Sequence, residues 1–178
     1  MADGLTSLSL TKWLQQCLQA ERGSRGDIGN LLRNISHFLV PKVVNATASL
    51  TLNPLTHAGK TVTLNAAAGL TVTLPAATGT GHIYRLFVGT TITSNNYVIQ
   101  VANATDVLAG GLAIATDIAG VVENTAATDD TITMNGTTTG GVIGGHIELE
   151  DVAAGYWRLS GFLVSTGVEA SPFSAAVA

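Results

Sequence analysis

Charged side chains are scarce in this chain: they make up 11% of its 178 residues, against roughly 25% in ordinary soluble proteins. So few charges leave much weakly polar surface, which favours a protein that is covered in part by partners. Residues 1–42 hold five basic and three acidic side chains, a net charge of +2, and the remainder holds three basic and nine acidic ones, a net charge of −6. Two net positive charges are too few to indicate nucleic-acid binding.

Cysteine and long hydrophobic runs are also lacking. Cys17 is the single cysteine, which excludes an intrachain disulfide framework and a zinc site made of several cysteines. No apolar run approaches the roughly 18 residues that a membrane-spanning helix requires, so we expect no membrane partner. The start of the chain, Met1-Ala2-Asp3-Gly4, lacks the basic and apolar regions of a secretory signal, and synthesis in a cytoplasm is expected.

Reactive motifs are missing as well. The sequence contains neither the Gly-x-Ser-x-Gly elbow of hydrolases nor a glycine-rich nucleotide loop. His146 and Glu148 stand two residues apart, on one face of a predicted strand, but zinc needs three or four converging ligands, so a solvated pair is favoured. Aromatic residues amount to 5%, too few to suggest a sugar cleft beside Glu148 and Glu150. The sequence therefore predicts no catalytic residue, no metal site and no cofactor.

What the chain has in abundance is alternation of threonine with apolar residues. Two near-identical phrases, TVTLN at 61–65 and TVTLP at 71–75, each describe a strand with one buried face. Their spacing of ten residues fits either a hairpin or two rungs of a short β-helix. We expect the hairpin, because the repeat does not continue beyond Pro75.

From Ala46 onward the apolar residues recur at every second position, and turn-forming residues separate the segments. Short strands about ten residues apart favour a mainly β fold, a β-sandwich, jelly roll or barrel. We predict a β-sandwich or jelly-roll-like domain over residues 46–178. Its expected strands are Ser49–Leu52, Thr61–Leu64, Leu70–Leu74, Ile83–Val88, Tyr97–Val101, Val107–Ile114, Thr131–Met134, His146–Val152 and Tyr156–Val164.

Residues 1–45 are predicted to form a short two-helix segment that anchors the protein. One amphipathic helix follows a cap at Ser9, and a second begins at Asp27 and ends near Pro41. Helices of about 12 residues are marginal alone, so they pack either on their own β domain or on another chain. The residues expected to bind a partner are Trp13, Leu14, Leu18, Leu31, Leu32, Ile35 and Phe38.

Several phrases of the β region resemble a family of small structural proteins from tailed bacteriophages. The resemblance covers roughly residues 46–177 and implies a capsid decoration (cement) protein or a head-fibre component, without catalytic residues. The N-terminal segment lies outside the matching phrases. The phrases are HAGKTVTLN at 57–65, GLTVTLPAATGTG at 69–81, YVIQVAN at 97–103, ELEDVAAGYW at 148–157 and SPFSAAV at 171–177.

The resemblance and the composition together predict a non-enzymatic virion protein. We expect it to bind the major capsid protein on the outer face of the capsid, as a homo-oligomer and most simply a trimer. The alternative is a tail-fibre, spike or head-fibre module that binds host surface receptors. A third class, a depolymerase-like enzyme, would require carboxylates that converge in a groove.

Overall fold

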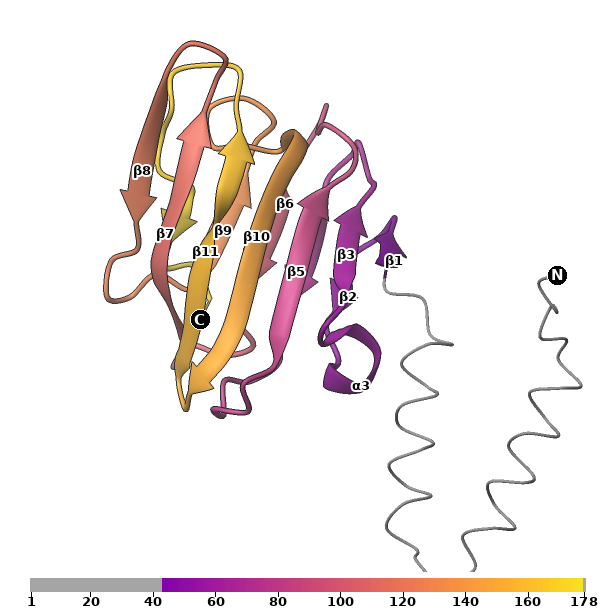
Figure 1. Ribbon diagram of the computed structural model, residues 1–178, viewed down its shortest axis with the longest axis vertical. Coiled ribbons are helices and arrows are strands. Elements are labelled where there is room, and N and C mark those ends of the chain that lie inside the picture. The colour runs from indigo at the N-terminus through magenta and orange to yellow at the C-terminus, as the bar shows by residue number, and fades with distance from the viewer. Residues whose placement is uncertain (1–42, 178) are drawn as a thin grey trace, which may run out of the picture. The chain divides into compact units, whose positions relative to one another are not determined.

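The computed structural model describes residues 43–177, which form two mixed β-sheets around one hydrophobic core (Figure 1). The predicted mainly β class is confirmed. The two predicted helices, and with them all the residues expected to bind a partner, lie outside the described residues. Within residues 43–177, no helix is long and apolar enough to cross a membrane.

The first six strands wind as three successive rungs, in the manner of a β-helix. Each rung places one strand in the larger sheet and the next strand in the smaller one. Within each sheet these strands stack in parallel, so that Ala46, Leu64 and Val88 lie side by side. The rungs are β1 (Val43–Ala46) with β2 (Leu50–Thr51), β3 (Thr61–Leu64) with β4 (Leu70–Thr73), and β5 (Ile83–Val88) with β6 (Tyr97–Gln100).

The two repeated phrases are therefore not a hairpin, and that expectation was wrong. Strands β3 and β4 belong to different sheets, where their buried Val62 and Val72 enter the core from opposite sides. The chain crosses between the sheets through Gly69, whose φ of +80° suits glycine and whose Cα approaches the Asn96 backbone too closely for a side chain. The next rung pairs with β3 in register but has a different sequence, Ile83–Val88.

The second half of the domain completes both sheets. Its strands are β7 (Val107–Ala115), β8 (Gly120–Asn124), β9 (Thr131–Met134), β10 (Val142–Ala153), β11 (Tyr156–Val164) and β12 (Phe173–Ser174). The seven-stranded sheet has the order β1-β3-β5-β10-β11-β7-β8, and the five-stranded sheet has the order β12-β9-β6-β4-β2. Strand β10 pairs antiparallel with β5 and β11, whereas β11 and β7 are parallel. These parallel pairs distinguish the domain from an all-antiparallel jelly roll.

Three strands and one helical turn were not predicted. Strand β1 crosses the boundary that the sequence placed between residues 45 and 46, β8 is exposed at most positions and so lacks alternation, and β12 has only two residues. The turn is α3 (Pro54–His57), which begins after Asn53, whose side chain accepts a hydrogen bond from the Leu55 N–H.

The core lies between the sheets and consists of inward-facing side chains from both. In the seven-stranded sheet, Trp157 and Tyr84 are buried and pack edge to face, with ring centroids 5.7 Å apart. Ile99, Ile132 and Met134 of the five-stranded sheet are fully buried. The alternation that the sequence shows thus corresponds to one core face and one outer face in each sheet.

Candidate interaction surface

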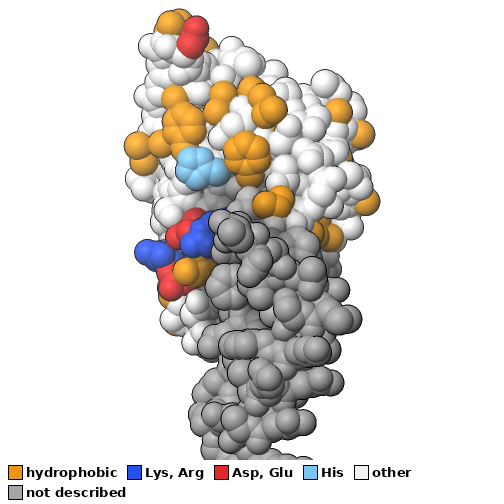
Figure 2. Space-filling view, turned by 45° about the vertical axis from the view of Figure 1, so that its right-hand side comes forward, with side chains coloured by type: hydrophobic (Ala, Val, Ile, Leu, Met, Phe, Trp, Pro, Cys, Tyr) orange, Lys and Arg blue, Asp and Glu red, His pale blue; other side chains and the backbone are white. Residues whose placement is uncertain are grey.

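The outer face of the seven-stranded sheet carries a line of mostly apolar side chains across five neighbouring strands. The pairing register aligns Phe87 of β5, His146 of β10, Phe162 of β11, Ala113 of β7 and Val122 of β8, which we call the apolar row. Phe87 and Phe162 are 37% and 36% exposed, and Val122 is 64% exposed. Figure 2 shows hydrophobic side chains gathered around a histidine on this face. An exposed row of mostly apolar side chains is typical of an interaction site.

His146 occupies the middle of the apolar row, between the two phenylalanines. Its ring centroid lies 6.3 Å from that of Phe162, with the two planes inclined by 34°. His146 pairs with Phe162 on one side and with Phe87 on the other, because β10 runs between β11 and β5. His146 therefore occupies the strand between those of the two phenylalanines, and its ring lies beside that of Phe162.

Three small residues and one valine border the apolar row on one side. Two residues along the strands from the row lie Gly89, Val164, Ala115 and Gly120, and the pairing of β10 with β11 is irregular between Val142 and His146. The side chains of Asn65 and Thr63 occupy the space beside Gly89. This border of the row is therefore uneven.

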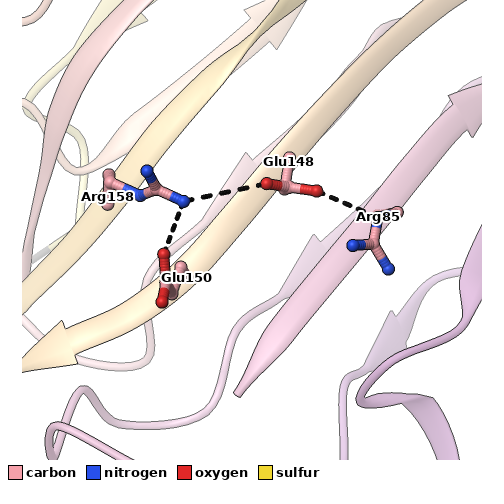
Figure 3. A network of polar contacts seen from close by, with 4 residues as sticks. All are labelled: Arg85, Glu148, Glu150 and Arg158. Atoms are coloured by element: carbon pink, nitrogen blue, oxygen red, sulfur yellow. Dashed lines mark hydrogen bonds and ion pairs between the residues drawn. The ribbon is translucent and has the colours of Figure 1, made fainter. Parts of the chain in front are cut away.

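Four charged side chains border the apolar row on its other side (Figure 3). The Arg85 Nε donates a hydrogen bond to Glu148 Oε2 at 2.9 Å. The Arg158 Nη2 lies 2.5 Å from Glu150 Oε2 and 3.8 Å from Glu148 Oε1. Cross-strand pairing sets these contacts, since Glu148 is opposite Arg85 and Glu150 is opposite Arg158. This charge ladder has no net charge.

The charge ladder is expected to contribute little to folding. Replacing Glu148 with Gln should lower the free energy of unfolding by less than about 1 kcal/mol, because exposed ion pairs are screened by water. The side chains of Arg85 and Arg158 are 46% and 55% exposed, so water reaches both ion pairs. Urea denaturation at low and high salt measures the effect. A loss of several kcal/mol that persists at high salt would contradict this assignment.

The paired residues His146 and Glu148 share one face, as the sequence predicted, but they do not act together. Glu148 contacts two arginines, which come from other strands, whereas His146 lies beside Phe162. The sequence described Glu148 as solvated and missed both arginine partners, because Arg85 and Arg158 lie on the two neighbouring strands and the order of the strands is not a local property of the sequence. No group of three His, Cys, Asp or Glu side chains within residues 43–177 is placed to hold a metal ion.

Asp151 belongs to the same acidic run but points into the protein, where it holds a loop. Its Oδ1 accepts hydrogen bonds from the N–H groups of Thr78 and Gly79, at 2.9 and 2.7 Å. Its Oδ2 accepts from the N–H and hydroxyl groups of Thr80, at 3.0 and 2.7 Å. Burial alone would raise the pKa of Asp151, but these hydrogen bonds to Thr80, Gly79 and Thr78 hold it below its usual value. The carboxylate therefore has a structural role.

A second buried carboxylate, Asp130, holds the C-terminal tail. Its Oδ1 accepts hydrogen bonds from the N–H groups of Ala176 and Val177, at 2.8 and 3.2 Å, and its side chain also receives the hydroxyl of Thr131. Asp130 is 5% exposed, so this carboxylate is buried. The tail N–H groups that bind Asp130 lie 46 and 47 residues away in the chain, so no local sequence pattern indicates them.

A shallow hollow lies between two loops at one end of the domain. It has a volume of about 360 Å³ and is lined by residues 116–119, which connect β7 to β8, and by residues 166–169, which follow β11. Ile118 and Val168 at its rim are 92% and 85% exposed. The Thr116 N–H donates a hydrogen bond to Glu169 Oε1 at 3.3 Å and so ties the two loops together.

The apolar row is not visible in the sequence, because its five members come from five strands and no two are neighbours in the chain. Comparison of the chain with protein-family models, with curated proteins and with solved structures gave no match. The geometry of the outer face is thus the observation on which a function can be based.

Proposed function

We propose that this chain is a non-enzymatic structural protein of a bacteriophage virion, which decorates the outer face of the capsid. It would bind the major capsid protein as a homo-oligomer. The observation that carries this proposal is the apolar row, an exposed surface of the kind that proteins use to contact one another. The phrases that resemble tailed-phage structural proteins support the virion context, and two of them form β3 and β4.

In this proposal the domain is a β-sandwich with a β-helix-like half, which serves as a rigid body. Decoration strengthens a shell when each copy bridges neighbouring capsid subunits, burying on the order of 800 Å² per partner. Binding to the assembled shell alone stabilises that shell by mass action. In this proposal the N-terminal segment, which the sequence predicts to be helical, contacts the capsid through Trp13, Leu14, Leu18, Leu31, Leu32, Ile35 and Phe38.

Removal of residues 1–42 tests the anchoring role. The shortened chain is expected to stay folded, because both sheets and their common core are complete within residues 43–177. It should lose capsid binding by at least about tenfold, since anchoring side chains of an interface dominate its affinity. Circular dichroism checks the fold, and co-sedimentation with shells of the major capsid protein from the same genome checks binding.

A full-length variant separates anchoring from any effect of truncation. Trp13→Ser combined with Leu14→Ser should reduce shell binding as the deletion does, whereas Leu55→Ser, at a 93% exposed position of α3, should not. Shells that carry the wild-type protein should survive heating better than bare shells. Binding by the shortened chain at the level of the full chain would refute the anchoring role.

A receptor-binding fibre or spike module is the second candidate. The observation that favours it is the pair of exposed side chains, Ile118 and Val168, on adjacent loops around the shallow hollow. Loops held on a rigid scaffold are frequent binding sites. The copy number per virion distinguishes the two candidates, since a decoration protein is present in numbers that match the capsid lattice and a fibre is present in few copies.

A further inference from the structure

We propose that the open edge of β8 binds an extended segment of another protein, in which apolar and basic residues alternate. The segment would add a strand to the seven-stranded sheet beyond β8. This inference goes beyond the proposed function, because it assigns a separate contact surface by its chemistry and requires no capsid. Three features support it: the direction of the backbone groups of β8, the exposure of this strand, and the charge of the domain.

The hydrogen bonds of β7 show which of its residues face β8. The Gly110 carbonyl accepts a hydrogen bond from the N–H of Thr125, which follows β8, at 2.9 Å. The Ala115 carbonyl accepts one from the N–H of Ser165, which follows β11, also at 2.9 Å. Backbone groups alternate in direction along a strand, so the even-numbered residues of β7 face β8 and the odd-numbered residues face β11.

The same alternation on β8 leaves three residues with backbone groups at the open edge. Val121 and Glu123 lie opposite even-numbered residues of β7 and bind them. Gly120, Val122 and Asn124 lie opposite odd-numbered residues, so their N–H and C=O groups point away from β7. Strand β8 is the last in its sheet, and these groups have no hydrogen-bond partner within residues 43–177. Such an edge can pair with the backbone of an extended chain.

Strand β8 lacks most of the features that protect edge strands from pairing. It has five residues, whereas the edge strands β2 and β12 of the smaller sheet have two each. It contains no proline or lysine, and its pairing with β7 has no bulge. Both of its faces are accessible, since Val121 on the inner face is 38% exposed and Val122 on the outer face is 64% exposed. Figure 1 shows β8 at the margin of the larger sheet, where an added strand would cover it.

The charge of the domain selects the kind of segment. Residues 43–178 have a net charge of −6, and Glu123, on the inner face opposite Leu112, is the single charged residue of β8. A second copy would bring another acidic domain to this edge, and like charges suppress such pairing. A segment with a basic side chain opposite Glu123 is attracted instead. We therefore infer a basic segment from another protein.

The outer face of the added strand is expected to be apolar. Val122 is the last member of the apolar row, so an apolar side chain opposite Val122 would continue the row onto the added strand. Successive side chains of a strand point to opposite faces. A segment in which apolar residues alternate with basic ones places the first kind beside Val122 and the second beside Glu123.

Hydrogen exchange followed by NMR tests whether the edge is open and whether it binds. In the full-length chain, the amides of Val122 and Asn124 should exchange rapidly, whereas those of Val121 and Glu123 should be protected by β7. A peptide of about ten residues in which valine alternates with lysine should slow exchange at Val122 and Asn124. A matched peptide with glutamate in place of lysine should have no effect.

A proline at the edge separates backbone pairing from side-chain contact. Val122→Pro removes an N–H that β7 does not use, and proline is tolerated at such positions of edge strands, so circular dichroism should show an unchanged fold. Fluorescence anisotropy of the labelled lysine peptide should show binding weaker by about tenfold or more, because an edge hydrogen bond is lost and the ring obstructs the added strand. The matched control, Val122→Thr, keeps the N–H and should retain most of the affinity.

Four outcomes would overturn the inference. Protection of the Val122 amide without peptide would show that the chain itself or a second copy already covers the edge. Binding of the lysine peptide by neither the wild type nor the control would remove the site. Equal binding by Val122→Pro and the wild type would exclude edge pairing, and equal binding of the two peptides would exclude selection by charge. If Val122→Pro does not fold, the exchange measurements on the wild type decide alone.

Co-sedimentation with capsid shells keeps the proposed function separate. A wild-type chain that binds the lysine peptide at the β8 edge but does not bind shells would refute the proposed function and leave this inference standing. A chain that binds shells but not the peptide would refute this inference and leave the proposed function standing.

Discussion

Replacement of Asp151 with alanine is expected to lower the free energy of unfolding by about 2–4 kcal/mol. The change removes the acceptor for three backbone N–H groups, those of Thr78, Gly79 and Thr80. Each buried donor that loses its partner costs about 1–3 kcal/mol, and water that reaches this loop offsets part of the sum. The loop carries no acidic residue of its own to replace the carboxylate. Urea denaturation followed by circular dichroism measures the loss.

The contribution of Asp151 is expected to depend on pH. Its pKa in the folded protein lies below the ordinary value of 3.8, so its stabilisation is present above about pH 4 and disappears as the pH falls through the lowered pKa. An Asp151→Asn variant should lose this part of the pH dependence. Asp117→Ala, at an exposed position, is the control and should change stability by less than about 0.5 kcal/mol. Equal losses in the two alanine variants would refute the role of Asp151.

Replacement of Trp157 with alanine is expected to cost about 3–5 kcal/mol, the range typical of large core aromatics. Trp157 is 1% exposed and packs against Tyr84 between the two sheets, so its removal leaves a cavity that the rigid sheets cannot close. Circular dichroism in urea measures the change, because Trp13 remains and complicates fluorescence.

The neighbouring aromatic residue provides a matched control. Tyr156 is 53% exposed and points to the opposite face of β11, so Tyr156→Ala should cost less than about 1 kcal/mol. Comparable losses at both positions would show that β11 does not divide its side chains between core and outer face in this register. The two variants differ by one position in the chain, which makes the comparison a direct test of the alternation.

Several strands followed from the sequence with their bounds. The predicted Thr61–Leu64, Ile83–Val88, Thr131–Met134 and Tyr156–Val164 agree with β3, β5, β9 and β11. Alternation of apolar and polar side chains is a local property, so it shows wherever one face of a strand is buried. Strand β8 escaped prediction for the same reason, since both of its faces are largely exposed.

The placement of the strands did not follow from the sequence. The repeated phrases at 61–65 and 71–75 were expected to pair with each other, yet β3 pairs with β1 and β5 while β4 pairs with β2 and β6. A strand with a given alternation can pair with any strand of matching length, and its sequence does not name the neighbour. The hairpin and the β-helix rungs therefore fitted the pattern equally well.

By itself, the sequence determined the β class, most strands and the side chains that face the core, because each of these depends on neighbouring residues in the chain. Only the tertiary structure decided that Phe87, His146 and Phe162 form one row and that Glu148 lies between Arg85 and Arg158. The same holds for Asp151, which binds a loop more than seventy residues away. These contacts depend on strand order and register, which are set by the packing of the whole core. The candidate interaction surface therefore forms only in the tertiary structure.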